Sequence, residues 1–331
     1  MKTLIIAEAG VNHNGSIEVA KNLIDVAVEA GADLVKFQLF KAERLATPLA
    51  NLAEYQKHSE SDLASQLQLL KNLQIEPEEY LELKKYAENC GITLFSSAFD
   101  LESLRFLLDL DEPLIKIPSG EITNFPMLKV AGSSGKKILV STGMSSLAEI
   151  RTTLQCLRSH MNNPQKIALL HCTSSYPTLM KDVNLRVIAT LRKEFEIEVG
   201  FSDHTLGIEA SIAAVGLGAT IIEKHFTLDS NLQGPDHKSS INPIELGLMI
   251  RSIRNIEEAL GTTHKHVLSC ELENRIGARK SLVAAKLIKK GELFSEENIT
   301  TKRPGIGVSP MAWEILLGTK SPRDYDVDDL I

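Results

Sequence analysis

The chain has 331 residues, of which 43% are hydrophobic and 24% are charged, with 36 Lys and Arg against 43 Asp and Glu and a net charge of −7. This composition is typical of a globular protein and excludes a disordered or fibrous chain. Proteins that bind nucleic acid or an anionic membrane need a basic face, so we expect neither partner. Single hydrophobic cores stop growing at about 250–300 residues, so the length predicts one large domain and one small one.

The sequence predicts neither a membrane segment nor a disulfide framework. No apolar run approaches the ~18 residues of a membrane span, and Met1–Thr3 leads into an apolar run without a signal-peptide cleavage pattern. The four cysteines, Cys90, Cys156, Cys172 and Cys270, lie far apart with no CxxC spacing. We therefore expect a cytoplasmic protein without structural disulfides or a thiolate zinc site.

Short apolar runs, separated by helical patterns, predict eight strands. The runs are nearly continuous in hydrophobicity rather than alternating, which is typical of strands buried on both faces. Helix-ending glycines, such as Gly31 and Gly91, precede several of them. Eight β/α units over about 260 residues favour an α/β fold of the closed (β/α)8 TIM barrel type, with an open doubly wound sheet as the alternative. The predicted strands are Leu4–Ala7, Leu34–Phe37, Thr93–Phe95, Leu114–Ile117, Ile138–Val140, Ile167–Leu170, Val199–Phe201 and Thr220–Ile222.

Three further segments depart from this repeating pattern. Residues 41–75 form a longer polar excursion between the second and third strands, and we expect it to cover an active-site mouth. The barrel domain, residues 1–261, is followed by a polar stretch at 262–279 that indicates a linker. In residues 280–331, short strand patterns alternate with Gly and Pro turns. This pattern predicts a compact tail domain, too small for a large core unless it docks on its own barrel or on a neighbour's.

Polar residues come at the ends of the predicted strands, and barrel enzymes carry their active sites at the carboxyl ends of the strands. Lys36 and Lys116, together with the hydroxyls of Ser97, Ser119 and Ser202, form a cationic set that is rich in hydrogen-bond donors. A phosphate needs point charges and donors to its oxygens, so the set favours a phosphate pocket over lysines that merely extend to solvent.

Two histidines are candidate metal ligands. His204 and His225 end adjacent predicted strands, so their imidazoles can converge on one divalent ion and leave positions open for substrate and water. Two imidazoles with open positions suit Mn, Co, Zn or Fe more than Ca. His171 is a weaker third candidate, and His13 and His237 lie in loops that could reach the mouth.

Four carboxylates, Glu8, Glu121, Asp203 and Asp236, are candidates for general acid or base chemistry. Their spacing does not assign their roles. Together with the cationic set and the histidines, they predict a metal-assisted enzyme that acts on a small, polar, phosphorylated substrate. The residues alone leave the reaction open.

The chain also carries a series of longer motifs in a fixed order, which are IAEAGVNHNG, VKFQ, KIPSGE, STGM, HCTSSYP, FSDHT, EKHFTLD, GPDH and TTKRPGIG. This series closely resembles the sialic acid synthase family, which includes N-acetylneuraminate and N,N′-diacetyllegionaminate synthases, over essentially the whole chain. The resemblance implies a barrel followed by an antifreeze-like (SAF) domain of the β-clip type. It implies a transferase that forms a C–C bond by condensing phosphoenolpyruvate with an N-acetylated hexosamine and releases phosphate.

Two acceptor sugars are consistent with this resemblance. N-acetylmannosamine would give N-acetylneuraminate, and 2,4-diacetamido-2,4,6-trideoxymannose would give N,N′-diacetyllegionaminate. They differ by an acetamido group and a hydroxyl, a difference that a few side chains could decide. The motifs lean only slightly between them.

The resemblance also assigns roles to individual residues. His204 and His225 are similar to the metal pair of the family, with Mn2+ as the usual ion and Mg2+ or Co2+ as alternatives, and Glu8 or Glu121 would act on the cationic intermediate or the attacking water. The family forms a domain-swapped homodimer, in which Arg303 resembles the tail arginine that reaches the N-acyl group of the sugar in the other subunit. The implied phosphoenolpyruvate pocket is Lys36, Ser97, Lys116, Ser119, Ser174 and Ser202, and the implied sugar contacts include Gln38, Tyr176 and Asp236.

Two other functional classes stay open at this point. A metal-dependent pyruvate aldolase is one, although a Schiff-base aldolase needs a single desolvated lysine, whereas two lysines with hydroxyls favour a phosphate pocket. A non-catalytic sugar-phosphate-binding protein is the other, and it would bind phosphoenolpyruvate without releasing phosphate.

Overall fold

The computed structural model describes residues 2–50, 65–163 and 166–331. The chain divides into two compact units, Met1–Gly261 and Thr262–Ile331.

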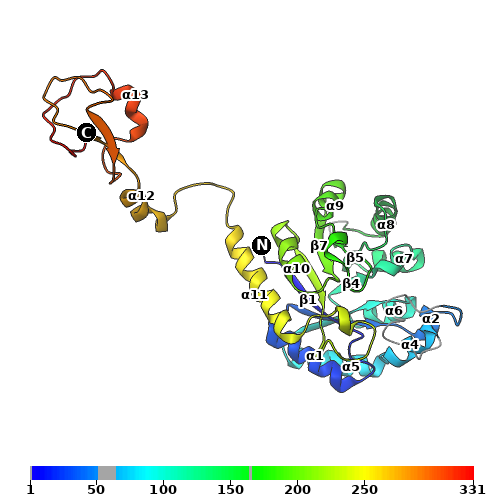
Figure 1. Cartoon of the computed structure of the whole chain (residues 1–331). Helices are drawn as coiled ribbons and strands as arrows, with labels where there is room; N and C mark the ends of the chain where they lie inside the picture. The colour runs from blue at the N-terminus through cyan, green and yellow to red at the C-terminus, as the bar shows by residue number, and fades with distance from the viewer. Residues whose placement is uncertain (1, 51–64, 164–165) are drawn as a thin grey trace. The chain divides into compact units, whose positions relative to one another are not determined.

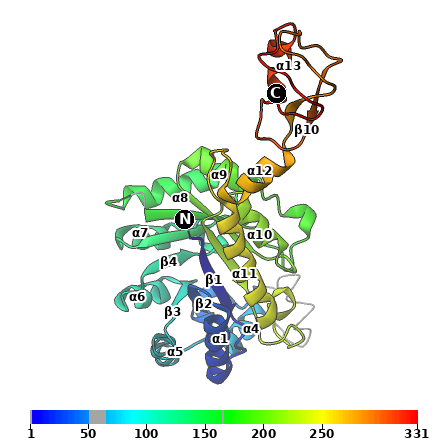
Figure 2. The ribbon, with the colours of Figure 1, turned by 90° about the vertical axis from the view of Figure 1, so that its left-hand side faces the viewer.

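Within the described residues of the first unit, eight parallel strands close a barrel in sequential order and helices surround it (Figures 1 and 2). Strand β1 pairs with both β2 and β8, so the predicted TIM barrel is confirmed and the open sheet is excluded. The strands are β1 Leu4–Gly10, β2 Leu34–Leu39, β3 Thr93–Ala98, β4 Leu114–Ile117, β5 Lys137–Ser141, β6 Ile167–His171, β7 Glu198–Asp203 and β8 Ile221–His225.

Most strands extend further toward their carboxyl ends than the apolar runs predict. Glu8, Ser97, Ser202 and His225 lie inside β1, β3, β7 and β8, although the sequence predicts them at the ends of these strands or beyond. Strands hold side chains more rigidly than loops do, so these polar groups have well-defined positions.

Inside the barrel, an apolar floor lies beneath a polar layer. Successive inward-pointing residues of a strand are two positions apart, so each floor residue is followed two residues later by a layer residue. Gly200 takes part in the floor because a Cβ there would lie 2.7 Å from Leu170 Cδ2, so only glycine leaves room for that leucine. The floor and layer pairs are Ile6 and Glu8, Leu34 and Lys36, Phe95 and Ser97, Leu114 and Lys116, Leu139 and Ser141, Gly200 and Ser202, and Ile221 and Glu223.

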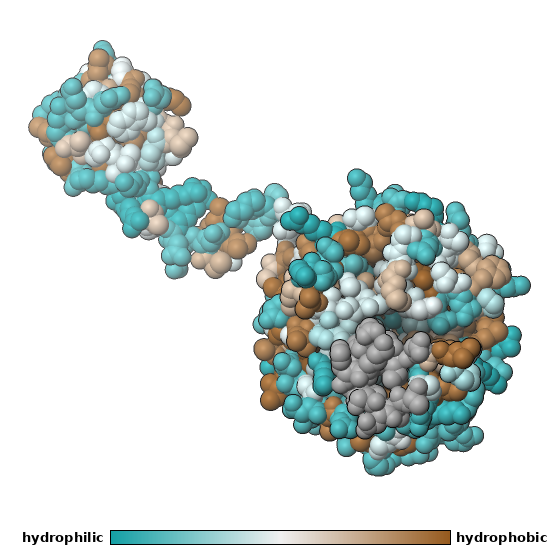
Figure 3. Space-filling model, turned by 45° about the vertical axis from the view of Figure 1, so that its right-hand side comes forward, coloured by the Kyte–Doolittle hydropathy of each residue, from teal (hydrophilic) through white to brown (hydrophobic). Residues whose placement is uncertain are grey.

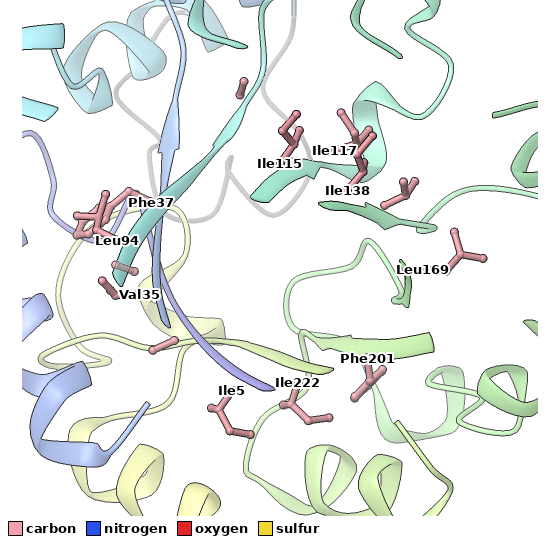
Figure 4. Packing of buried hydrophobic residues seen from close by; sticks show 14 of the residues in the cluster. Ile5, Val35, Phe37, Leu94, Ile115, Ile117, Ile138, Leu169, Phe201 and Ile222 are labelled. Atoms are coloured by element: carbon pink, nitrogen blue, oxygen red, sulfur yellow. The ribbon is translucent and has the colours of Figure 1, made fainter. Parts of the chain in front are cut away.

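The alternate residues of the strands point outward and form the main core with the helices (Figure 4). Ile5, Val35, Ile138 and Ile222 are fully buried there. Burial of such a side chain contributes about 1.5–3 kcal/mol. The helices of this unit are α1 Ile17–Ala30, α2 Ala42–Leu45, α4 Gln66–Leu73, α5 Pro77–Asn89, α6 Leu101–Asp109, α7 Phe125–Ser133, α8 Leu147–Ser159, α9 Val187–Phe195, α10 Glu209–Gly216 and α11 Pro243–Leu260.

Local sequence signals begin and end these helices. The Ser16 hydroxyl accepts a hydrogen bond from the Val19 N–H at the start of α1, and Asp100 accepts from two backbone N–H groups at the start of α6. Helix α1 ends at Gly31, whose φ of 82° lies in the left-handed region that glycine adopts without strain. The predicted helix-ending role of this glycine is thus confirmed.

The excursion predicted at residues 41–75 carries α2 and α4 in its described part. Leu69 and Leu73 of α4 pack with Val11 and Phe40 in a small separate core. Residues 51–64 of the excursion lie outside the described residues, so the expected cover over the mouth stays a prediction.

The second unit has its own small core, formed by Ala284, Ile288, Phe294, Ile299 and Tyr325. Its sheet consists of two antiparallel strands. The stretch predicted as a linker contains the short 3-10 helix η5 and the helix α12. The elements are η5 Ser269–Glu271, α12 Leu272–Ala278, β9 Ser281–Ala284, β10 Ile299–Lys302, the 3-10 helix η6 Pro310–Ala312 and α13 Trp313–Leu316.

The surface of the barrel unit mixes both kinds of side chain on the face shown in Figure 3, where hydrophobic residues lie among hydrophilic ones. Isolated exposed hydrophobic residues of this kind are normal on protein surfaces. Among the described residues, no helix has both the length and the apolar character needed to cross a bilayer.

Candidate active site

A cavity of about 590 Å³ lies at the carboxyl end of the barrel. Its size is typical of a site for small molecules. Its further lining residues include Gln66, Ser141, Met144 and Glu223. The predicted site residues that line it are Glu8, Lys36, Gln38, Ser97, Lys116, Ser119, Ser174, Tyr176, Ser202, His204 and His225.

The two lysines of the predicted phosphate set lie close to a shared carboxylate at the bottom of this cavity. Lys116 Nζ is 3.2 Å from Glu223 Oε1, and Lys36 Nζ is 3.6 Å from Glu223 Oε2. Lys36 also lies 2.7 Å from Glu8 Oε2. The side chains of both lysines are only 3% exposed. Two cations are therefore buried at one place, with two carboxylates to balance them.

Hydroxyl groups complete this charged centre. Lys36 Nζ donates to Ser97 Oγ at 2.8 Å, and Ser202 Oγ donates to Glu223 Oε1 at 2.8 Å. Hydroxyls beside ammonium groups can donate to the oxygens of a bound anion once the hydrogen bonds rearrange. The predicted cationic set therefore has the composition of a phosphate or carboxylate site.

Glu8 and Glu223 have different pKa values because their surroundings differ. Burial raises the pKa of Glu8 to about 7, although Lys36 opposes the rise. Burial would raise the pKa of Glu223 as well, but Lys116 and Lys36 hold it at about 2. Near neutral pH Glu223 is thus a fixed anion, whereas Glu8 can exchange a proton.

The same environment acts on the two lysines in opposite directions. Burial would lower the pKa of Lys36, but the carboxylates of Glu223 and Glu8 raise it overall. Burial lowers the pKa of Lys116, and the nearby positive charge of Lys36 lowers it further. An anion bound between the two ammonium groups would favour the charged form of both.

Gly143, after β5, brings two more hydroxyls together. A Cβ at this position would lie 2.2 Å from Ser174 Oγ and 2.8 Å from Ser119 Oγ, so a larger residue would displace both. The Gly143 N–H donates to Ser119 Oγ at 3.0 Å. The two predicted serines consequently face the same side of the cavity.

The two predicted metal ligands lie next to each other, with ring centroids 5.7 Å apart. His204 Nδ1 lies 2.7 Å from the Thr173 carbonyl, which requires that Nδ1 carries the proton and leaves the Nε2 lone pair available. His225 Nδ1 is buried without a hydrogen-bond partner within the described residues. Burial lowers the pKa of His204 to about 4 and the pKa of His225 well below its usual value, so both rings are neutral at pH 7.

Neutral imidazoles with an available nitrogen are suitable ligands for a divalent transition metal. The described residues contain no group of three or more His, Cys, Asp and Glu arranged to hold an ion. His204 and His225 offer two ligands to such an ion and leave its other positions to substrate and water.

Two predicted residues of the barrel unit, Asp236 and Glu121, do not line this cavity, and a third, Arg303, belongs to the second unit. Asp236 is buried, its Oδ2 is 3.9 Å from His225 Nδ1, and burial raises its pKa to about 6. Glu121 lies in the 3-10 helix η1 Ser119–Glu121 and accepts a hydrogen bond from Asn124 Nδ2 at 2.6 Å. Arg303 belongs to the second unit and is exposed there. Their predicted roles stay predictions.

The structure corrects one interpretation of the sequence. Asp203 was among the candidate acids and bases, but its side chain points away from the cavity and accepts from Thr205 N–H at 2.8 Å and from Ser211 Oγ at 2.7 Å. It also pairs with Lys224 at 3.1 Å, and both side chains are fully buried. The inward-outward alternation of β7 and β8 explains this position, because Asp203 and Lys224 each follow an inward-pointing residue. Asp203 therefore stabilises the packing outside the barrel.

The weaker metal candidate also lies outside the pair. His171 Nε2 is 2.7 Å from the Val183 carbonyl, and its ring stacks on Phe201 in the outer core. It does not line the cavity that His204 and His225 line.

Glu223 lies at the centre of this charged group, although the sequence assigns it no role. It occurs among the polar residues at the end of the eighth predicted strand, without an assigned role. Its signal was the spacing to His225, because residues two apart in a strand point to the same side. An inward His225 thus implies an inward Glu223.

Comparison with known proteins agrees with this geometry and confirms the resemblance found in the sequence. Residues 23–265 match the NeuB family, and residues 279–325 match the SAF domain. The chain is 49% identical to the N,N′-diacetyllegionaminic acid synthase of Campylobacter jejuni over 330 residues, which cover 100% of this chain and 99% of the relative. It is 42% identical to the enzyme of the same name from Legionella pneumophila, with 97% and 90% covered.

Among solved structures, the N-acetylneuraminic acid (sialic acid) synthetase from Leptospira borgpetersenii superposes with a TM-score of 0.72 at 34% identity. The match covers 83% of this chain and 90% of that one. With a family match over most of the barrel, and relatives of high identity along the full chain, this protein belongs to the NeuB family and carries a SAF domain.

Proposed function

We propose that this chain is a nonulosonic acid synthase that condenses phosphoenolpyruvate with 2,4-diacetamido-2,4,6-trideoxymannose, forms N,N′-diacetyllegionaminate and releases phosphate. The observation that carries the proposal is the burial of Lys36 and Lys116 in one cavity beside two neutral imidazoles. The names of the relatives at 49% and 42% identity support this acceptor. N-acetylmannosamine is the second candidate, supported by the sialic acid synthetase at 34% identity.

The anion pocket would act mainly by positioning and electrostatics. Phosphoenolpyruvate carries a phosphate and a carboxylate, and Lys36 and Lys116 would bind them. The hydroxyls that would complete the pocket are those of Ser97, Ser119, Ser174 and Ser202. Since Glu223 stays charged between the two lysines, it would keep their ammonium groups in place before the anion arrives.

The reaction forms one C–C bond and replaces the C–O bond to phosphate by a C–O bond to an oxygen from water. C3 of phosphoenolpyruvate bonds to the aldehyde carbon of the open-chain sugar, whose oxygen takes up a proton and becomes a hydroxyl. Positive charge then develops at C2, and water adds there and loses a proton. The C2 hydroxyl formed in this way loses its proton to the departing phosphate as the bond between C2 and the phosphate oxygen breaks, which leaves the C2 carbonyl of the product. Glu8, with a pKa of about 7 and 2.7 Å from Lys36, is our candidate for stabilising the cationic carbon or guiding the water, and Glu121 is the other candidate.

A divalent ion completes the proposed site. His204 and His225 would hold Mn2+, with Mg2+ or Co2+ as alternatives, and the bound ion would supply Lewis acid chemistry at the aldehyde oxygen. Gln38, Tyr176 and Asp236 would contact the hydroxyl and acetamido groups of the sugar. Tyr176 lies with its ring centroid 4.2 Å from that of His204, so it would form one wall of the sugar site.

We further propose that the protein works as a domain-swapped homodimer, in which Arg303 contacts the N-acyl group of the sugar bound in the other subunit. The exposure of Arg303 and the match of its unit to the SAF domain support this arrangement. Mixing Lys116→Met subunits with Arg303→Ala subunits tests it, because one site of each mixed dimer would then regain both wild-type residues. Recovery of activity on mixing is the expected result, and no recovery would contradict the swap.

The proposed function is tested by phosphate release from phosphoenolpyruvate with Mn2+ present. The two acceptors, 2,4-diacetamido-2,4,6-trideoxymannose and N-acetylmannosamine, are supplied in parallel, and a chelated sample is the control. We expect release with the diacetamido sugar, with chelation abolishing it. Release with N-acetylmannosamine alone would establish the second candidate, and release with neither would reject the synthase proposal for both acceptors.

A further inference from the structure

Two loops at the mouth of the barrel are joined by a buried side-chain amide. Asn12, in the loop after β1, is 1% exposed. Its Nδ2 donates to the Phe226 carbonyl at 2.8 Å and to Ser240 Oγ at 2.9 Å, and both partners belong to the segment after β8. A carbonyl only accepts, so the Phe226 contact fixes which atom of the amide is the nitrogen. Asn12 thus connects the first and last loops of the barrel.

The Ser240 hydroxyl passes this connection on to Asp236. Ser240 Oγ donates to the Asp236 carbonyl oxygen at 2.6 Å. The same oxygen accepts from the Ser239 N–H at 3.1 Å and from Ser239 Oγ at 3.0 Å. Three donors therefore fix the backbone of Asp236, and that backbone directs its buried carboxylate to a point 3.9 Å from His225 Nδ1.

Stability alone does not explain an asparagine at position 12. Its Oδ1 is buried and has no hydrogen-bond partner within the described part of the chain. A buried acceptor without a partner lowers stability and offsets part of what the two donated bonds contribute. The contribution of the Asn12 amide therefore lies in where its two hydrogen bonds go, because both hold the segment after β8.

We propose that Asn12 is a positioning residue that holds Asp236, through the Ser240 hydroxyl, in the place from which its carboxylate can contact the acceptor sugar. This inference rests on the proposed function, in which Asp236 binds that sugar. Asn12 would act on the acceptor and leave phosphoenolpyruvate unaffected, because its hydrogen bonds lead to the loop after β8 and do not reach Lys36 or Lys116.

The chain offers a matched control for this inference. Asn14 lies in the same loop, and its Nδ2 donates to the Gln233 carbonyl of the opposite loop at 2.7 Å. It makes the same kind of connection without a bond to Ser240 or to Asp236. Since its φ is 50°, Asn14→Gly removes the side chain without backbone strain.

Steady-state kinetics of the full chain with Mn2+, phosphoenolpyruvate and the acceptor that the wild type uses will test the proposal. We expect Asn12→Ala and Ser240→Ala to lower kcat/KM for the acceptor about 10-fold, with the KM for phosphoenolpyruvate within two-fold of the wild-type value. Asn14→Gly should match the wild type. The double variant Asn12→Ala with Asp236→Asn should lose no more than Asp236→Asn alone, because both changes act through the same carboxylate.

Several outcomes would overturn the inference. Asn12→Ala behaving like Asn14→Gly would reject it, and so would losses that multiply in the double variant, since a general loss of loop structure predicts independent effects. If Asn12→Ala fails to fold, Ser240→Ala decides, because it removes a single hydroxyl. A wild-type chain that releases no phosphate with either acceptor would reject the proposed function itself, and the inference with it.

Discussion

The two ends of the same barrel use charged side chains in different ways. At the amino end, Asp33 accepts from the Ile5 N–H at 2.9 Å and pairs with Arg254 of α11 at 2.8 Å, and its side chain is 19% exposed. Lys137 pairs with Glu198 at 2.7 Å between the starts of β5 and β7. These charges are partly hydrated and each has a partner, so they connect strands to a helix or to each other at little desolvation cost.

At the carboxyl end the charges are buried and incompletely satisfied. Lys36, Lys116, Glu8 and Glu223 are each at most 5% exposed, and His225 Nδ1 lacks a hydrogen-bond partner within the described residues. Burial of charges costs more than a surface pair gains, so stability does not explain this arrangement. The charges at the amino end thus hold the barrel together, whereas the carboxyl end keeps charged groups ready for a ligand.

The largest expected effect is on turnover, from Glu8→Gln at the carboxyl end. This change removes a group that can exchange a proton near neutral pH, so kcat should fall by about 10²–10⁴. The KM for phosphoenolpyruvate should stay within a few-fold, because Lys36 keeps its contacts with Ser97 and Glu223. Phosphate-release kinetics measures both values. Glu198→Gln, at the amino end, is the control and should leave kcat unchanged, and an unchanged kcat in Glu8→Gln would remove Glu8 from the mechanism.

The next effect is on substrate affinity and compares two lysines of neighbouring strands. Lys116→Met removes a buried cation of the proposed phosphate pocket, so the KM for phosphoenolpyruvate should rise about 100-fold. Lys137→Met removes a cation at the amino end, so the KM values for phosphoenolpyruvate and for the acceptor sugar should stay within two-fold of the wild-type values. Kinetics of the two variants, with calorimetric titration of phosphoenolpyruvate, measures the difference. Equal effects at both ends would end the functional distinction between them.

The sequence predicts much of the difference between the two ends of the barrel. The features that it does not predict have structural causes. The apolar runs predict all eight barrel strands and the carboxyl-end location of Lys36 and Lys116. They underestimate how far the strands extend, because Glu8, Ser97 and His225 are polar and interrupt the run while still lying inside the strand. Hydrophobicity marks where a barrel strand packs, but at the mouth the inward position is polar.

Which polar groups meet was harder to predict. Glu223 contacts lysines of β2 and β4, which are more than 100 residues away along the chain, and only closure of the barrel brings them together. Asp203 looked similar to Glu223 in the sequence, yet it points outward because it lies one position from the inward Ser202. Strict counting of inward and outward positions would have separated these two carboxylates.

A smaller effect is expected on stability at the amino end. Asp33→Asn removes the charge that pairs with Lys2 and Arg254, so the free energy of unfolding should fall by about 1–2 kcal/mol. Kinetic constants should stay at wild-type values, because the change lies at the opposite end of the barrel from the cavity. Urea unfolding followed by circular dichroism, together with the phosphate-release assay, measures both. A loss of activity without a loss of stability would show that the two ends are coupled.

The smallest effect is the pH dependence of the difference in unfolding free energy between wild type and Asp33→Asn. A variant at the carboxyl end, Glu8→Gln, should show a pH dependence of the opposite direction. Burial would raise the pKa of Asp33, but hydrogen bonds from Lys2 and the Ile5 N–H lower it overall. A lowered carboxyl pKa stabilises the fold above the unfolded pKa of about 4, and this contribution disappears as the pH falls through the folded pKa. The difference between wild type and Asp33→Asn should therefore be largest near pH 6, at about 1–2 kcal/mol, and shrink as the pH falls below about 4.

Glu8 should show the opposite behaviour in the same urea titrations. Its raised pKa of about 7 favours the folded state while the carboxyl is protonated, and this contribution is lost as the pH rises from about 4 through 7. The stability of Glu8→Gln relative to the wild type should accordingly increase over that range, where Asp33→Asn shows little change. If both variants kept a constant stability difference from pH 3 to pH 8, neither carboxyl would have the shifted pKa on which the contrast between the two ends depends.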